Sequence, residues 1–566
     1  MKQSTQHHGG IRGATTQKQS SQFEGRFGRM FRSLPAAQFS AHDLKVLAEG
    51  LLDNAGNVLV PGILSEAETD GNGQPIAAPE SEADSEENFS IPAGYTYLGQ
   101  FIDHDITFDP SSSLQKQNDP EALTNFRTPR LDLDCLYGRG PEDQPYLYEF
   151  RDGWPARFAL SRELKFGDKT SPARDLLRLG GRAVIGDKRN DENVIVSQLQ
   201  GAMLQFHNRV ARAMGKGTSF EAVQQAVRWH YQTIVLHDFL PRICGQAMVH
   251  SILPHLASGK SIRDDAPKLR YYRWRHEAFI PIEFSAAAYR FGHSMVRPIY
   301  RLNGELNDGG PAVGEDASLQ GRSLIFAGIS KRALNGFREF PDAWAIDWSL
   351  YFGDISTTVF GPKRVQPSYK IDCSMVNPLG FLPEFSKLDD TATGLNKGNF
   401  QAQMKPGQIS NNLPLRNLMR GQSMGLPSGQ AVARAMGVEP LWPDQIKVGK
   451  AQVVDNEGKV EATPITELVP GLGNHTPLWA YILAEATHQW EADVAGKTKD
   501  NANKVGTRLG EVGGRIVAET LIGLLLADGH SFLAQDPNWK PWAIKPDDQG
   551  KPYTMRELLR FAGLQA

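Results

Sequence analysis

The sequence predicts a mainly α-helical protein with a single large domain. Apolar residues recur at helical spacing in four stretches, residues 194–209, 220–239, 412–420 and 478–533. No internal repeat and no sustained strand alternation is present in the sequence. With 566 residues, 40% of them hydrophobic, the chain can bury a large core. We expect residues 34–566 to form one domain with little β structure.

Two polar stretches near the N-terminus are expected to lie outside that core. Residues 1–33 are rich in Gln, Ser, Gly and Arg without periodicity, which is typical of a flexible arm. Residues 65–88 contain eight acidic residues and no Lys or Arg. This composition predicts a solvated, flexible acidic loop, with order beginning near Ile91.

Charge, cysteine content and hydropathy exclude several classes of protein. A net charge of −3 gives no general attraction to nucleic acid. Three scattered cysteines, Cys135, Cys244 and Cys373, do not form a disulfide framework or a cysteine metal site. Neither a signal peptide nor an apolar run near 18 residues is present. We expect a soluble protein without a membrane span, cytoplasmic by default, with non-classical secretion left open; the oligomeric state is not indicated.

The segment Tyr97–Phe108 places polar groups in an apolar setting. Gln100, Asp103, His104 and Asp105 stand within six residues, among Leu, Phe and Ile side chains. Buried charges need a partner or a metal. In a helix, Gln100 and His104 share a face, whereas Asp105 points about 200° away from Asp103, at roughly 100° per residue. One helix turn is therefore expected to serve two different sites.

A second oxygen-rich segment follows at residues 127–138. Pro129 argues against a helix, so we expect an extended backbone. Four alternate side chains would then face one way: Thr128, Arg130, Asp132 and Asp134. Such a pattern suits Ca²⁺, with Arg130 offering only its carbonyl and Asp105 completing the site. A solvent-facing turn with two ordinary aspartates fits the same residues.

A charged pair stands just ahead of the helix expected at residues 194–209. Arg189 and Glu192 are three residues apart in a polar loop. Taken alone, such a pair is more typical of the protein surface than of a catalytic site.

The segment 284–299 is expected to be a helix of small residues that ends near Pro298. Arg290 and His293 would share one face, and Gly292 leaves room for a flat group against the backbone. A lone histidine in such a helix is usually a core residue. An arginine one turn away is a natural partner for a carboxylate, which favours a functional role.

In order along the chain, these segments resemble the animal-type haem peroxidases of the peroxidase–cyclooxygenase superfamily, over roughly residues 90–530. The resemblance rests on six motifs: Gly99-Gln-Phe-Ile-Asp-His-Asp105, Leu131-Asp-Leu-Asp134 with Tyr137-Gly138, Gly186-Asp-Lys-Arg189 with Glu192, His207-Asn-Arg209, Tyr289-Arg-Phe-Gly-His293 and Leu415-Arg-Asn417. The lack of a signal peptide and of disulfides resembles a bacterial-type member. The resemblance implies a mainly α domain of many helices around a buried haem.

The resemblance also implies roles around that haem. His293 matches the proximal iron ligand, and Asn417 matches the residue that bonds its other ring nitrogen. His104 matches the distal histidine that moves the peroxide proton, and Arg189 matches the arginine that stabilises charge on the leaving oxygen. Two supporting positions complete the set: Gln100, holding water or a halide, and Arg290, pairing with a haem propionate.

Further cofactor chemistry follows from the same resemblance. Asp103 and Glu192 match carboxylates that can become ester-linked to haem b. Asn193 stands where the mammalian granulocyte enzyme has a haem-linked methionine, so no sulfonium bond can form, and bromide, iodide, thiocyanate or phenols are expected as donors rather than chloride. The family's calcium ligands match five positions: Asp105, Thr128, the Arg130 carbonyl, Asp132 and Asp134. Asp134 stands where many relatives carry serine.

The implied function is a peroxidase that uses H2O2 to oxidise halides, pseudohalides or small aromatic donors, in keeping with a response to oxidative stress. A fatty-acid dioxygenase of the same superfamily is the first alternative, but it would carry a tyrosine three residues before the proximal histidine, where Arg290 stands here. The motif-like stretch from Tyr272 to His276 has one residue too many. A non-catalytic haem scaffold or adhesion protein would usually lose the distal groups. A non-haem metal enzyme would leave His293 unexplained.

Overall fold

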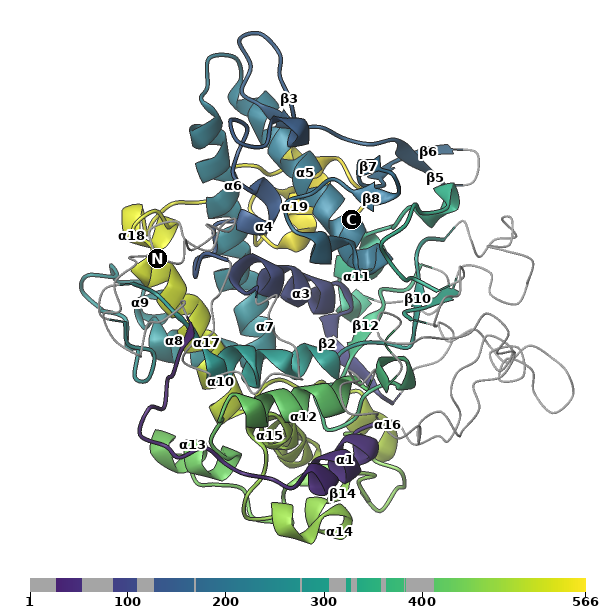
Figure 1. Cartoon of the computed structure of the whole chain (residues 1–566), viewed down its shortest axis with the longest axis vertical. Helices are drawn as coiled ribbons and strands as arrows, with labels where there is room; N and C mark the ends of the chain where they lie inside the picture. The colour runs from purple at the N-terminus through teal and green to yellow at the C-terminus, as the bar shows by residue number, and fades with distance from the viewer. Residues whose placement is uncertain are drawn as a thin grey trace, which may run out of the picture.

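A computed structural model describes residues 27–52, 85–108, 127–166, 169–274, 277–304, 322–326, 333–357, 363–380, 382 and 412–566. The fold is mainly α-helical with little strand, which confirms the predicted fold class (Figure 1). Within these ranges, nine helices have eight or more residues: α1 (Ala41–Gly50), α3 (Gly94–Ile106), α5 (Val194–Met214), α6 (Phe220–Ile234), α12 (Leu413–Ser423), α13 (Gly429–Met436), α15 (Leu478–Val494), α17 (Glu511–Ala527) and α19 (Met555–Ala562).

Shorter helices connect the long ones. The α-helical pieces are α4 (Asp134–Tyr137), α7 (Leu240–Cys244), α8 (Gln246–Ile252), α9 (His255–Ser258), α10 (Ile282–Ser285), α11 (Ser349–Phe352), α14 (Ile465–Leu468), α16 (Lys499–Asn503) and α18 (Phe532–Gln535). A π-helical turn, η4 (Val235–Phe239), continues α6 into α7. Two 3₁₀ turns matter for function: η3 (Lys188–Asp191) and η5 (Ala288–His293).

The β structure consists of short two-stranded ladders. They pair β1 (Phe27–Gly28) with β9 (Ile280–Pro281), β2 (Glu87–Pro92) with β12 (Pro367–Tyr369), β3 (Tyr148–Glu149) with β4 (Arg157–Phe158), β5 (Glu163–Phe166) with β6 (Lys169–Arg174), β7 (Arg178–Leu179) with β8 (Arg182–Ala183), β10 (Ile299–Arg301) with β11 (Arg322–Leu324), and β13 (Lys447–Val448) with β14 (Thr463–Pro464). Only β1 and β9 run parallel among these ladders.

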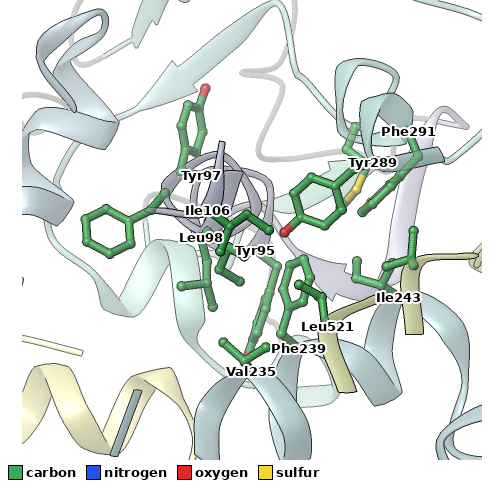
Figure 2. Close-up of a cluster of buried hydrophobic side chains, with 14 of the residues drawn as sticks. Tyr95, Tyr97, Leu98, Ile106, Val235, Phe239, Ile243, Tyr289, Phe291 and Leu521 are labelled. Carbon is green, nitrogen blue, oxygen red and sulfur yellow. The ribbon is translucent and has the colours of Figure 1, made fainter. Parts of the chain in front are cut away.

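One hydrophobic core extends through most of the described chain, from Phe27 to Ala566. Helix α3 lies at its centre, and its buried residues Tyr95, Leu98 and Ile106 meet Val235 and Phe239 of η4 (Figure 2). The first residue of α3, Gly94, packs so closely that a side chain would not fit, because a Cβ there would lie 2.6 Å from the Phe352 ring. Helix α3 thus occupies the position that the apolar setting of its sequence indicates.

The N-terminal segment differs from the expected flexible arm. Residues 1–26 lie outside the described residues, but β1 and the residues after it pack on the domain. Buried Glu283 of α10 accepts hydrogen bonds from the backbone nitrogens of Met30 and Phe31, each at 3.0 Å. Arg29 donates to the carbonyl oxygens of Met424 and Gly425 at 2.9 and 3.0 Å. The ordered domain therefore includes residues 27–33.

The end of the predicted acidic loop is also ordered. Residues 65–84 lie outside the described residues, but Glu87 begins β2 and is fully buried. Its carboxylate pairs with Arg297 at 2.9 Å and with Arg364. The acidic composition of this segment predicts solvent exposure. Glu87 is buried instead because its two arginine partners lie more than 200 positions further along the chain, where the local sequence gives no sign of them.

The expected helix over residues 284–299 is broken in two. α10 ends at Ser285 and η5 runs from Ala288 to His293, with Ala287 between them at φ −138° and ψ −74°. The chain continues from His293 to β10 without regular helix. Small residues favour close packing here, but the tighter 3₁₀ turn changes which side chains share a face.

Two of the other expectations can be compared with the described residues. All three cysteines are free and buried. Within the described ranges, no helix is both long enough and apolar enough to cross a membrane.

We predict that Glu283→Leu will release the segment from Phe27 to Phe31. The change removes the acceptor of two buried N–H groups, and each unsatisfied group costs about 1–3 kcal/mol. Tryptic cleavage after Arg29 should become faster and the thermal midpoint should fall. Glu283→Gln keeps one acceptor oxygen and should show a smaller effect; an unchanged cleavage rate in Glu283→Leu would contradict this attachment.

Candidate active site

A cavity of about 770 Å³ lies at the centre of the molecule. Its lining comes from α3, η3, α10, η5 and α12 and includes ten residues that matter for chemistry: Gln100, Asp103, His104, Arg189, Glu192, Arg290, Gly292, His293, Arg416 and Arg420. Seven of the eight predicted haem-site residues therefore line one cavity. The eighth, Asn417, lies directly behind His293.

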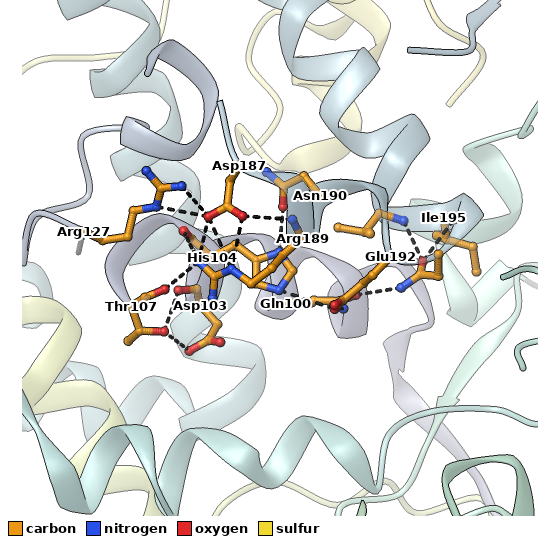
Figure 3. A network of polar contacts seen from close by, with 12 residues as sticks. Gln100, Asp103, His104, Thr107, Arg127, Asp187, Arg189, Asn190, Glu192 and Ile195 are labelled. Atoms are coloured by element: carbon orange, nitrogen blue, oxygen red, sulfur yellow. Dashed lines mark hydrogen bonds and ion pairs between the residues drawn. The ribbon is translucent and has the colours of Figure 1, made fainter. Parts of the chain in front are cut away.

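The ring of His104 is held from behind by an asparagine. Its Nδ1 atom lies 2.7 Å from the side-chain oxygen of Asn190, at the end of η3 (Figure 3). Asn190 in turn donates its amide hydrogen to Gln200 of α5 at 2.9 Å. Both amide residues are fully buried. The other ring nitrogen, Nε2, lies 3.5 Å from a Glu192 carboxylate oxygen on the cavity side.

Arg189 is fixed by a buried carboxylate and by helix α3. Asp187 accepts from the backbone nitrogen, Nε and Nη2 of Arg189, at 2.9, 3.2 and 2.8 Å. Arg189 Nη2 also donates to the carbonyl oxygens of His104 and Thr107, at 3.0 and 2.6 Å. Arg127 pairs with Asp187 from the other side. Burial alone would raise the pKa of Asp187, but Arg189 and Arg127 hold that pKa well below its usual range.

Gln100 bridges two residues that follow η3. Its side-chain nitrogen donates to Glu192, and its oxygen accepts from Asn193 Nδ2 at 3.1 Å. Asn193 also caps α5, because its oxygen accepts from the backbone nitrogens of Ile195 and Val196 at 3.1 and 2.9 Å. Asn193 therefore both lines the cavity and caps the N-terminus of α5.

The backbone of residues 335–337 presses on the same turn. Gly336 donates to the carbonyl oxygen of Glu192 at 3.1 Å, and Phe337 donates to that of Asp191 at 2.7 Å. A Cβ on Gly336 would lie 1.8 Å from the Asp191 oxygen, so only glycine permits this approach.

Asp103 lines the cavity on the α3 side, and its carboxylate accepts a hydrogen bond from Thr107 Oγ1 at 2.9 Å.

On the opposite side, His293 ends the 3₁₀ turn η5. The side-chain nitrogen of Asn417, on α12, lies 2.7 Å from its Nδ1 atom. Arg290 donates to the Asn417 oxygen at 2.7 Å and to the Ser285 carbonyl at 3.0 Å. Trp479 of α15 donates to the Arg290 carbonyl at 3.2 Å.

Electrostatics keeps the His293 ring neutral. Burial lowers the pKa of His293 to about 3, and Arg290 acts in the same direction. Burial also lowers the pKa of Arg290 to about 10; Asp103 opposes this, while Arg420 and Arg416 add to it. A neutral imidazole is the form that binds metals.

The cavity suits a flat, anionic prosthetic group. The position of a Cβ on Gly292 has no atom within 4 Å, so the backbone beside His293 is accessible from the cavity. Arg290, Arg416 and Arg420 place three guanidinium groups at its wall, which is a donor set for carboxylates. Iron ligation through Nε2 of His293 calls for the Asn417 oxygen, rather than its nitrogen, at Nδ1; a half-turn of the carboxamide exchanges the two and ends the hydrogen bond from Arg290 to that oxygen.

The segment proposed to bind calcium is a tight loop rather than an extended strand. Leu133 adopts a left-handed conformation with φ 58°, and α4 begins at Asp134. Two contacts hold this loop: Asp105 of α3 accepts from Leu133 N at 3.2 Å, and Thr128 donates to both oxygens of Asp132 at 2.8 Å. The predicted alternation of side chains on one face is therefore wrong.

The carboxylates of this loop nevertheless come together behind α3. Burial and the nearby charges of Asp132 and Asp134 raise the pKa of Asp105. Asp105 Oδ1 is buried without a hydrogen bond, whereas Arg130 turns outward to Asp528 at 3.8 Å. Within the part of the chain that the structure describes, no group of three or more His, Cys, Asp or Glu residues is arranged to hold a metal ion.

Several functional neighbours were not identified from the sequence. Asp187 lies inside the motif Gly186-Asp-Lys-Arg189 and Asn190 follows it directly, but nothing in the sequence marks their contacts. Arg127 belongs to the calcium segment by position but pairs with Asp187 across 60 residues. Arg416 and Arg420 are detectable in principle, because they stand one before and three after Asn417 on one helix.

Fold and site together define a mainly α-helical protein with a central cavity lined by two histidines. The family described as animal haem peroxidase matches residues 66–337. Peroxidase mlt-7 of Caenorhabditis elegans is 24% identical over 227 residues, which is 37% of this chain and 29% of that protein. A Drosophila melanogaster peroxidase is 27% identical over 217 residues, 35% of this chain and 29% of that protein. Residues 66–337, just under half of the chain, are therefore similar to the animal haem peroxidase family.

The solved structure of Peroxidase A from Dictyostelium discoideum has the same fold. It superposes with a TM-score of 0.52 and 16% sequence identity, covering 95% of this chain and 96% of that one. The matched segment spans less than a third of the length of the curated relatives named above.

Proposed function

We propose that this protein is a haem peroxidase that reduces H2O2 while oxidising halides, pseudohalides or small aromatic donors. The observation that carries the proposal is that His104, Arg189 and His293 line one cavity. Each histidine has its Nδ1 atom beside an asparagine amide, so that Nε2 is the ring nitrogen left for chemistry. This set of residues in one cavity agrees with the match of residues 66–337 to the animal haem peroxidase family.

Haem bound in the cavity would supply the iron that binds peroxide and stores oxidising equivalents. His293 would hold the iron through its neutral ring. Arg290, Arg416 and Arg420 would hold the propionates.

The distal residues would transfer the peroxide proton and stabilise the negative charge on the departing oxygen. His104 Nε2 would accept a proton from peroxide and return it to the departing oxygen, which leaves as water. Arg189 would stabilise negative charge on that oxygen. Because Asp187 already holds the guanidinium in place, the Arg189 side chain would not have to move during the reaction. Gln100 would hold water or a halide near this point while bridging Glu192 and Asn193. The two oxidising equivalents would then be consumed either by two aromatic donors that give one electron each or by one halide ion that gives two.

A specific feature disfavours the fatty-acid dioxygenase alternative. Arg290, at the position of the dioxygenase tyrosine, is engaged with Asn417 and Ser285. The hydroxyl of Tyr272, in the other motif-like stretch, donates to Phe279 within the core at 2.8 Å. Oxygen uptake with linoleate, without added peroxide, would favour the dioxygenase instead.

We predict that the purified, haem-supplemented protein will show a Soret band that changes on adding peroxide, followed by oxidation of bromide, iodide or phenols. His104→Leu should keep the Soret band but react with peroxide about 10²–10⁴-fold more slowly, the usual contribution of a positioned base. His293→Leu should bind haem poorly. His250→Gln, on α8 away from the cavity, is the matched control. A missing Soret band in the wild-type protein would contradict the proposal.

We also propose that Asp103 and Glu192 form ester links to the haem during peroxide turnover. Both line the cavity, one from α3 and the other after η3. Acid–acetone extraction after turnover should leave part of the haem on the protein. The retained fraction should fall in Asp103→Asn and in Glu192→Gln, and fall further in the double variant. Complete removal of haem from the wild-type protein after turnover would exclude covalent attachment.

We further propose that Ca²⁺ binds behind α3 through Asp105, Thr128, the Arg130 carbonyl, Asp132 and Asp134. The mutual repulsion of Asp105, Asp132 and Asp134 supports this, because a divalent cation would neutralise charges that burial makes costly. Two routes connect this region to the distal groups. Asp105 adjoins His104 in α3, and Asp134 lies 3.6 Å from Arg127, the partner of Asp187.

We predict that chelation will lower peroxidase activity before haem is released. Loss of the cation would loosen the backbone that carries His104 and alter the position of Arg127. Activity, Soret absorbance and bound calcium should be followed together during chelation, and activity should return when calcium is restored. Unchanged activity after verified removal of calcium would exclude this coupling.

A further inference from the structure

We propose that Asn190 is the positioning residue that places the ring hydrogen of His104 on Nδ1, so that Nε2 remains the proton acceptor. The inference deepens the proposed function and depends on it for the identity of the proton donor, which is peroxide. Its basis is the geometry behind the histidine, on the side that faces away from the cavity.

The contact between the two side chains is short and enclosed. His104 Nδ1 and Asn190 Oδ1 are 2.7 Å apart, the distance of a strong hydrogen bond. Asn190 is fully buried and His104 is 5% exposed, so water does not compete for either partner. In such surroundings a hydrogen bond is stronger, and its loss is more costly, than at the surface.

The chemistry of the amide sets the direction of the bond. A carboxamide oxygen only accepts hydrogen bonds, so Nδ1 must be the donor. A neutral imidazole carries one ring hydrogen, and its presence on Nδ1 leaves a lone pair on Nε2. This is the nitrogen on the cavity side, 3.5 Å from Glu192.

The amide is itself held in place. Asn190 Nδ2 donates to the Gln200 oxygen at 2.9 Å, and the Asn190 backbone nitrogen donates to the Asp187 carbonyl at 3.1 Å. Gln200 belongs to α5 and Asp187 precedes η3, so two elements fix Asn190 relative to α3. The ring of His104 therefore has a defined rotation as well as a defined tautomer.

A residue that merely filled space would not need an oxygen at this position. Leucine has a similar size and shape to asparagine, so Asn190→Leu keeps the volume while it removes the hydrogen bonds to His104 and Gln200. The asparagine oxygen matters only if the ring hydrogen on Nδ1 matters. This difference allows packing and positioning to be separated by substitution.

The decisive measurement is the tautomer of His104 by NMR on the full chain labelled with ¹⁵N-histidine. Spectra are recorded on the protein as purified and after loading with zinc protoporphyrin IX, which is diamagnetic. Comparison with His104→Gln assigns the resonance among the 14 histidines. We expect the wild-type ring to carry hydrogen on Nδ1, and Asn190→Leu to lose this preference.

The same variants are compared in the reaction of the haem-loaded protein with peroxide. Asn190→Leu should react about 10- to 100-fold more slowly, a loss similar to that seen when the hydrogen-bond partner of a metal-bound histidine is removed. Asn190→Asp restores an acceptor oxygen and should recover most of the rate and the Nδ1–H tautomer. Asn208→Leu, which removes a buried amide of α5 that is bonded to the backbone of Phe158 in β4, controls for lost stability and should change neither readout.

Three results would overturn the inference: hydrogen on Nε2 in the wild-type ring, an unchanged tautomer in Asn190→Leu, or an altered tautomer without loss of rate. If Asn190→Leu does not fold by circular dichroism, Gln200→Leu takes its place, because it removes the partner that orients Asn190. A wild-type protein with the expected tautomer but no reaction with peroxide would contradict the proposed function and leave the positioning role intact.

Discussion

The distal side of this protein depends on one buried carboxylate, that of Asp187. It lies between the guanidinium groups of Arg127 and Arg189 and is 2% exposed. Removing a single partner of such a buried ion pair typically costs about 3–5 kcal/mol, because a charge is left without compensation. Through Arg189 the same group is tied to the carbonyl oxygens of His104 and Thr107, where α3 ends. The carboxylate thus joins three segments that carry the chemistry.

On the proximal side a buried amide, rather than a carboxylate, connects the functional side chains. Asn417 lies between His293 and Arg290, and Trp479 of α15 binds the carbonyl of Arg290. Each histidine of the cavity is thereby held at Nδ1 by an amide from another element. Neutral amides suit this task because they orient a ring without adding charge to a buried site, where an unpaired charge is costly.

The sequence was most informative where one element contains the whole pattern. Helix α3 was predicted with its two functional faces, because Gln100, His104 and Asp105 are separated by fixed helical angles. Prediction was poorest where distant segments meet. Glu87 was assigned to a solvated loop, since its partners Arg297 and Arg364 are remote in the chain. Asn190 has no local signal, because its partner is 86 positions away. Backbone geometry was also inaccessible: the break at Ala287 and the left-handed Leu133 depend on tertiary contacts rather than on local propensity.

The order of the cavity's parts along the chain affects how the protein can be made. His104 and Arg189 are synthesised early, whereas Asn417 follows His293 by 124 residues. Helix α19, near the last residue, packs against α5, and the segment at Phe27 closes over α10. Contacts of such long sequence separation form slowly, and during synthesis they must wait for the distal part of the chain. The residues that line the cavity run from Phe27 to Met424, so the cavity can form only after residue 424 has been synthesised, and capture of a prosthetic group there would follow that point.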